Sequence, residues 1–273
     1  MKKRTSLYLL LCAVLCSCKA QKAKPIHPPV SDLTEMHMLG KVRQVCETMY
    51  SLKHKAISRY TTSWSDMDSA KKDSVKYSIT QDFDENGNKI KFTNGEYNAT
   101  YTYTYDVWNY KLTSTMITTN RNKVYTVYKY DTAGNIVKVD EYENGRTDSL
   151  EHTQHYKYDK KGNKIWEFDH TFHQLGNPQA SHEIEYSYDS LGNIIESRIP
   201  SPDPGIKYSG KKTFTYDKSG LVVKEDDYGA DNIVLHRIAY QYIKDSNNNW
   251  TKRLELIDGL TDNLTERKIS YYP

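Results

Sequence analysis

The sequence predicts an all-β fold built from tandem β-hairpins. Three observations carry this prediction: a recurring turn motif, aromatic residues at every second position before each turn, and a repeat period between 22 and 30 residues. The motif reads aromatic-Asp-x-x-Gly-Asn-x-aliphatic. Good copies begin at Phe83, Tyr130, Tyr158, Tyr188 and Tyr216, and weaker ones at Tyr105 and Tyr242.

The first residues have the composition of an export signal. Lys2, Lys3 and Arg4 precede an apolar run of nine residues, 7–15, which is too short to span a bilayer. Residues 1–17 are therefore predicted to be a signal peptide and take no part in the fold.

The end of this segment resembles a bacterial lipobox, because Leu15-Cys16-Ser17-Cys18 places an aliphatic and a small residue before a cysteine. The resemblance implies that Cys18 carries lipid after cleavage, and two or three acyl chains anchor a protein stably in a membrane. Residues 18–32 are polar and proline-rich, so we expect an anchored, flexible tether. The rest, 33–273, is predicted to form one repeat domain.

Composition disfavours several classes of function. Cys46 is the only thiol left beyond the lipidated residue, which excludes an internal disulfide and a thiolate zinc framework. Without Lys2, Lys3 and Arg4 the 38 lysines and arginines fall to 35, which equals the number of acids. A neutral chain without a basic stripe is not expected to bind nucleic acid.

Each motif copy has the chemistry of a tight turn. Aspartate at the first turn position can accept hydrogen bonds from amides two residues on, and glycine three residues later adopts positive φ at little cost. This predicts a type I turn that closes on a G1 bulge. The residues assigned this structural role are Asp84, Gly87, Asp131, Gly134, Asp159, Gly162, Asp189, Gly192, Asp217 and Gly220.

Alternating aromatic and β-branched residues before each turn predict strands, with return strands after it. Seven hairpins give about fourteen strands, more than an open sheet usually carries without curling. We expect neighbouring hairpins to form one long antiparallel sheet that is strongly twisted or spiralling, with a closed β-barrel as the alternative. A further strand is predicted between Gly40 and Ser51, whereas 51–73 is not assigned.

Residues 77–273, with their Tyr-Asp-x-x-Gly-Asn turns, resemble the YD repeats of the Rhs family. In that family long arrays form shells around toxins, and shorter arrays occur in surface proteins described as carbohydrate-binding. By comparison with those arrays, we expect this chain to be too short to enclose a cargo and to carry no toxin domain after its repeats. The opening strand behind a lipobox also resembles YD-repeat lipoproteins of the Bacteroides group.

No catalytic residue, metal site or cofactor is predicted, and we expect the protein not to be an enzyme. The pairs His152/His155 and His170/His173 would face opposite sides of a strand. The Asp82–Gly87 stretch imitates a calcium loop, but its twelfth position is Thr93 rather than glutamate. Motifs of nucleophilic or phosphate chemistry do not occur in the sequence.

The aromatic residues are the remaining functional signal. Tyrosine columns mainly stabilise sheets, but an aromatic face also offers a surface on which sugar rings stack. Trp108 and Trp250 are the candidate ligand contacts. We therefore expect a binding module for glycan or protein, held by lipid in the cell envelope, at the outer membrane. The alternatives are a purely structural envelope scaffold and, more distantly, an accessory of a toxin system.

Overall fold

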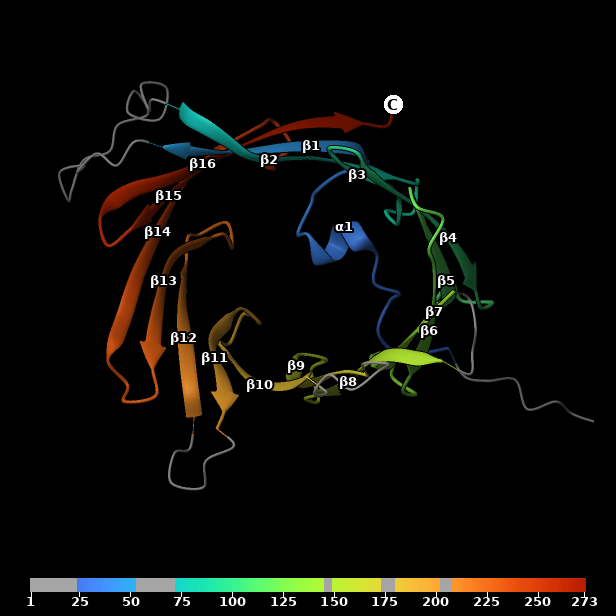
Figure 1. Cartoon of the computed structure of the whole chain (residues 1–273). Helices are drawn as coiled ribbons and strands as arrows, with labels where there is room; N and C mark the ends of the chain where they lie inside the picture. Colours follow the sequence, from blue (N-terminus) through green and yellow to red (C-terminus); the bar gives the residue numbers. More distant parts are fainter. Residues whose placement is uncertain (1–23, 53–71, 145–148, 173–179, 202–207) are drawn as a thin grey trace, which may run out of the picture.

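The computed structural model describes residues 24–52, 72–144, 149–172, 180–201 and 208–273. Over these residues the chain forms one short helix and sixteen strands (Figure 1). The elements are α1 (Asp32–Glu35), β1 (Val42–Leu52), β2 (Lys72–Phe83), β3 (Lys89–Asn94), β4 (Tyr97–Tyr105), β5 (Lys111–Thr118), β6 (Lys123–Tyr130), β7 (Ile136–Glu143), β8 (Leu150–Tyr158), β9 (Lys164–Thr171), β10 (Ala180–Tyr188), β11 (Ile194–Pro200), β12 (Tyr208–Tyr216), β13 (Val222–Gly229), β14 (Val234–Lys244), β15 (Trp250–Ile257) and β16 (Leu260–Tyr271).

The strands form a closed antiparallel barrel rather than an open spiral. Each strand pairs with its neighbours in sequence, and β1 pairs with β16 through contacts such as Val45 opposite Ile269. The preference for an open spiralling sheet was wrong, and the closed alternative is correct. The seven repeat hairpins account for β2 to β15. β1 and β16 join the two free edges, so that the sheet of described strands has no open edge.

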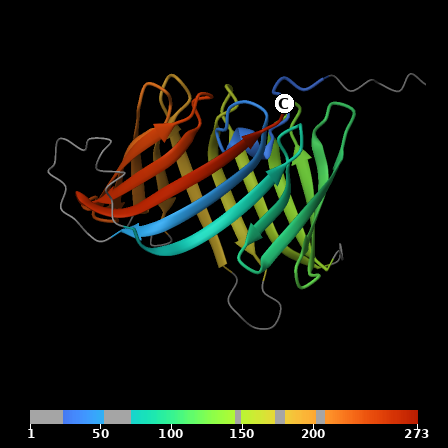
Figure 2. The same cartoon turned by 90° about the horizontal axis from the view of Figure 1, so that it is seen from above.

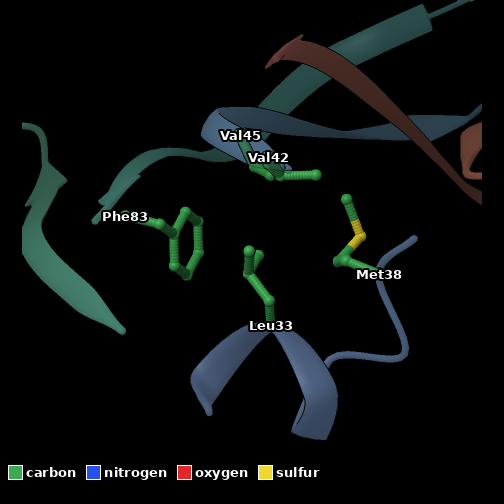
Figure 3. Packing of buried hydrophobic residues seen from close by; sticks show 5 residues of the cluster. All are labelled: Leu33, Met38, Val42, Val45 and Phe83. Atoms are coloured by element: carbon green, nitrogen blue, oxygen red, sulfur yellow. The ribbon is translucent and has the colours of Figure 1, made fainter. Parts of the chain in front are cut away.

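Helix α1 lies inside the ring of strands (Figure 1). Ser31 caps its N-terminus by accepting a hydrogen bond from the amide of Thr34. Beside the helix a small hydrophobic core joins it to the inner wall, as Figure 3 shows. Its members are Leu33, Met38, Val42, Val45 and Phe83.

A second group of buried side chains lies on the opposite face of the sheet, where β14 to β16 meet β1. Leu254 and Leu256 alternate along β15 with Arg253 and Glu255, which face the interior. The group consists of Leu52, Leu254, Leu256 and Leu264, with Ile243 packed against it. The described residues therefore form two small apolar clusters, one on each face of the barrel wall.

The two ends of the barrel are built differently. Since the sheet is an antiparallel meander, every Tyr-Asp turn lies at the same end (Figure 2). We call this end, with its turns between β2 and β3, β4 and β5, and so on to β14 and β15, the YD rim. The other connections, where the structure describes them, lie at the opposite rim.

The chain before β1 crosses the YD rim. The amide of His27 donates to the carbonyl of Ala133 at 2.7 Å, and the amide of Leu33 donates to the carbonyl of Gly87 at 3.0 Å. Leu39 exchanges two hydrogen bonds, both 2.7 Å, with the side chain of Asn249. Residues 24–32, which the sequence assigns to the tether, thus contact the barrel. Cys18 and the signal peptide lie outside the described residues.

Candidate binding site in the barrel lumen

The repeat signature builds the YD rim through its aspartates. In the turn after β6, one carboxylate oxygen of Asp131 accepts the amides of Ala133 and Asn135 at 2.9 Å each. Its other oxygen accepts the side-chain amide of Asn135 at 2.9 Å. Burial alone would raise the pKa of Asp131, but these bonds hold it below its usual value. The same two backbone bonds recur at Asp84, Asp106, Asp159, Asp189, Asp217 and Asp245.

Left-handed backbone closes each turn. Glycine holds this conformation at Gly87, Gly134, Gly162, Gly192 and Gly220, with φ between 81° and 97°. The two degenerate copies use asparagine instead, with φ of 70° at Asn109 and 63° at Asn248. Asparagine tolerates this region better than other side chains, so that the weaker copies still form the same turn.

The tyrosine of the signature faces the lumen, and in four copies its hydroxyl bonds to the preceding hairpin. The hydroxyl of Tyr216 donates to the carbonyl of Ile194 at 2.7 Å, and that of Tyr242 donates to Val222 at 2.7 Å. Corresponding bonds join Tyr130 to Lys111 and Tyr188 to Lys164. Burial raises the pKa of Tyr188 to about 12, so its hydroxyl is protonated at neutral pH and can donate.

The lumen is accessible to solvent, although a closed wall surrounds it. The tyrosines along β4, β6, β8, β10 and β14 are half-buried, apart from Tyr97 at the start of β4, which is exposed. Glu35 of α1 is exposed, yet burial by the surrounding protein raises its pKa, while Lys111, Lys164 and Lys89 oppose that shift. These lysines come from three separate strands around α1, the helix that carries Glu35 and lies inside the ring (Figure 1).

Cations lie over the aromatic rings of the inner wall. The ammonium of Lys111 is 4.8 Å from the ring centre of Tyr103, and that of Lys164 is 5.2 Å from the rings of both Tyr156 and Tyr186. Such contacts stabilise a cation by about 0.5–2 kcal/mol, depending on desolvation. The lumen therefore combines aromatic faces with positive charge.

The densest such group is the arginine–tryptophan cluster, defined as Arg253, Arg267, Trp250 and Tyr240. The guanidinium of Arg267 lies 3.4 Å from the ring centre of Trp250 and pairs with Glu47 at 2.7 Å. Arg253 lies 5.2 Å from Trp250 and 5.4 Å from Tyr240. Its Nε is buried without a hydrogen-bond partner, and no ion pair joins it to any described residue.

The structure does not bring the two predicted tryptophan contacts together. Trp250 begins β15 and belongs to the lumenal cluster. Trp108 lies in the turn between β4 and β5 on the YD rim, where its amide donates to Asp106 at 2.9 Å. Both side chains are half-buried. Only Trp250 therefore lies among other candidate ligand contacts.

Aromatic residues also form a short strip on the outer wall. Along β9 the rings of Trp166 and Phe168 lie 6.2 Å apart and nearly parallel, and His170 continues the row at 6.0 Å from Phe168. Trp166 donates to Glu183 of β10. The strip alternates with Glu167, which faces the lumen and accepts the hydroxyl of Tyr186 at 2.8 Å.

The histidines do not assemble a metal site in the described part of the chain, where no group of three candidate ligands occurs. His152 contacts Asp169 at 2.7 Å and Glu141 at 3.3 Å. His155 lies on the other face of β8, against Phe168, with ring centres 6.3 Å apart. His173 lies outside the described residues.

No family model and no curated protein matches the chain. Among solved structures, the toxin complex TcdB2-TccC3 without its hypervariable C-terminal region is similar at 15% identity and a TM-score of 0.32, over 80% of this chain and 12% of that one. A porin-like protein from Bacteroides uniformis is similar at 12% identity and a TM-score of 0.37, over 84% of this chain and 96% of that one. A putative outer membrane lipoprotein-sorting protein domain from Vibrio parahaemolyticus is similar at 8% identity and a TM-score of 0.27, over 84% of this chain and 85% of that one.

These likenesses are too distant to assign a function. The chain spans about an eighth of the toxin structure that it matches. No helix among the described residues is long and apolar enough to cross a membrane.

Proposed function

We propose that this protein is a lipid-anchored, non-enzymatic envelope lipoprotein of the YD-repeat type whose barrel lumen binds a polar, extended ligand such as a glycan. The observation that carries the proposal is the accessible inner wall of half-buried tyrosines. Binding sites for small ligands are concave and aromatic, with a few placed polar groups. The lumen has this composition, and Arg253 offers it a guanidinium whose buried Nε has no hydrogen-bond partner among the described residues.

The outer wall supports a position at the membrane surface rather than within the lipid. A barrel that crosses a membrane carries an apolar band on its outer face. Here Lys138 pairs with Asp140 at 2.8 Å and Lys72 pairs with Glu266 at 2.8 Å, at positions that alternate with lumenal residues. Charges along the strands favour water on both faces, so the lipid on Cys18 would supply the attachment.

A glycan array with the full-length lipoprotein in detergent tests this function. We expect one sugar class to bind, and binding to be lost in Trp250→Ala and Arg253→Gln. Trp166→Ala is the matched control, because this tryptophan faces outward, and it should bind as the parent does. Circular dichroism establishes that each variant is folded.

Two outcomes would overturn the lumenal proposal. The first is a blank array with folded protein, and the second is sugar binding that Trp166→Ala removes while Trp250→Ala retains it. The second result would move the binding site to the outer aromatic strip on β9.

A structural envelope scaffold is the second candidate function. The signature residues favour it, because the hydrogen bonds of Asp131, Gly134 and Tyr216 are satisfied within the barrel and require no ligand. A scaffold would show no ligand-dependent stabilisation. A bound ligand instead raises the unfolding temperature with its concentration, which thermal scans with candidate glycans measure.

A further inference from the structure

The most exposed large hydrophobic side chains of the described residues gather at one end of the barrel. Val107 is 90% exposed, Leu191 is 86% exposed and Ile26 is 82% exposed. Val107 and Leu191 lie at the tips of the turns after β4 and β10, and Ile26 precedes His27, which bonds to the turn after β6. All three therefore belong to the YD rim.

Neither turn geometry nor folding explains these side chains. The tips of such turns normally carry small or polar residues. The structures of the turns depend on Asp106 and Asp189, whose carboxylates accept the backbone amides, so the tip side chains contribute nothing to the turns. The isolated barrel therefore leaves these apolar side chains uncovered at one end.

The distribution of the three side chains fits a flat partner. Figure 1 shows β4 and β10 on widely separated parts of the ring, so Val107 and Leu191 do not form one compact patch. Tips at the same end of a cylinder can touch a plane together. A lipid surface is such a plane, whereas a protein partner would need to span the whole rim.

The predicted anchor reaches this end of the barrel. Six residues lead from Cys18 to Lys24, and an extended chain of that length spans about 20 Å at most. Since His27 is bonded to the turn after β6, lipid on Cys18 must enter the membrane close to the YD rim. The opposite rim lies a full strand farther away.

We infer that the YD rim rests on the lipid surface, with Val107, Leu191 and Ile26 in the interfacial layer. This inference rests on the lipid anchor of the proposed function. Trp108, beside Val107, then lies at the level of the headgroups, where tryptophan is favoured. Lys160, Lys161 and Lys218 occupy other turn tips, and Glu85 is the acid among them.

Charge does not carry the inference. The seven turn aspartates also lie at this rim and outnumber the four charged tips. Their carboxylates are bonded to backbone amides of their own turns, so they do not project toward a partner. Binding should therefore depend on apolar insertion, and zwitterionic vesicles are the appropriate probe.

Depth-dependent fluorescence quenching tests the orientation. In a Cys46→Ser background, Leu191→Cys places a polarity-sensitive dye on the YD rim. Ile233→Cys, at a 62% exposed position in the turn after β13, places it on the opposite rim as the matched control. Both full-length lipoproteins are reconstituted in phosphatidylcholine vesicles that contain brominated lipids.

We expect a blue shift and strong quenching at position 191 and neither at position 233. Equal quenching at both positions, or none at 191, would overturn the inference. The intact mass shows separately whether Cys18 is acylated, so that a missing anchor is distinguished from a wrong orientation. A blue shift without quenching, together with a doubled particle mass, would mean that two copies meet rim to rim.

The combined Val107→Ser and Leu191→Ser change sharpens the test. Both side chains are exposed, so the barrel should unfold at the same temperature as the parent. With the dye at Ile26→Cys, quenching by shallow brominated lipids should fall severalfold in this variant. Unchanged quenching at position 26 would show that the anchor alone holds the protein at the membrane and would refute insertion of the rim.

Discussion

The two rims of the barrel differ in how the chain reverses direction. On the YD rim every turn uses an aspartate as hydrogen-bond acceptor and a residue with left-handed backbone three positions after it. On the opposite rim the described turns have different constructions, with positive φ at Gly95, Arg121, Asn232 and Asp258. Repetition in the sequence therefore marks one end of the fold, and the segment before β1 packs against that regular end.

The largest loss of stability should come from changing a turn glycine that is covered by the segment before β1. A Cβ on Gly134 would lie 2.6 Å from the hydroxyl oxygen of Tyr110 and 2.9 Å from the carbonyl oxygen of His27, at φ of 97°. We expect Gly134→Ala to destabilise the protein by about 3 kcal/mol, from overpacking and backbone strain together. Denaturant unfolding measures the loss.

Gly220→Ala is the matched control on the same rim. Its φ is 81°, but a Cβ there meets nothing within 4 Å, so only backbone strain of about 1 kcal/mol should remain. Equal losses at the two glycines would show that the N-terminal segment does not press on the turn after β6.

The next largest loss of stability should come from removing a turn aspartate, and it should differ between the two rims. Asp131→Ala removes the acceptor of two backbone amides and one side-chain amide, and we expect a loss of about 2 kcal/mol. Asp231 of the opposite rim accepts one amide, that of Ile233 at 3.1 Å, and Asp231→Ala should cost less than half as much. Unfolding free energies that reverse this order would contradict the comparison.

A smaller effect is expected within the lumen. Tyr216→Phe removes the hydroxyl that bonds to Ile194 and should destabilise the barrel by about 1 kcal/mol. Tyr125, which alternates with lumenal residues on β6 and faces outward, gives the control Tyr125→Phe with no loss. A null result at Tyr216 would mean that inter-hairpin hydroxyl bonds do not contribute to stability.

The smallest loss of stability per turn should result from protonation of the turn aspartates at low pH. Hydrogen bonds to Asn163 and Asn193 hold the pKa values of Asp159 and Asp189 below their usual value. A carboxylate whose pKa is lower in the folded than in the unfolded protein stabilises the fold at pH values above its pKa in the unfolded chain, about 3.9 for aspartate. That stabilisation is lost as the pH falls through the pKa of the folded state. The unfolding temperature should therefore decrease below about pH 4, and less steeply in Asp189→Asn. An identical pH profile in that variant would contradict the assignment.

Local signals in the sequence predicted the hairpins, because each turn depends on residues that lie four positions apart at most. Closure could not be predicted in this way. No residue within a repeat distinguishes an open sheet from a closed one, since closure depends on the summed twist and on the pairing of β1 with β16. The last strand, Leu260–Tyr271, was not assigned from the sequence either.

The lumen was only partly predictable. Alternation identifies the face that holds the tyrosines but not which face the barrel encloses. Trp250 was therefore predicted as a ligand contact without its lumenal position, and Arg253 was missed. Glu35 was missed because its helix follows the segment interpreted as a tether. Ser31, followed by Asp32 and Leu33, is a recognisable helix start that could have signalled an ordered segment.

The pairing of β1 with β16 sets an order of events for folding. Cys46 lies opposite Lys268, more than two hundred residues later in the chain, so the ring cannot be completed before nearly the whole polypeptide is available. Each hairpin can form as soon as its own turn exists, but the last seam involves contacts of very high sequence separation and should form slowly. During export, an incomplete chain would expose two unpaired strand edges, and it is in this interval that the protein is most vulnerable to aggregation.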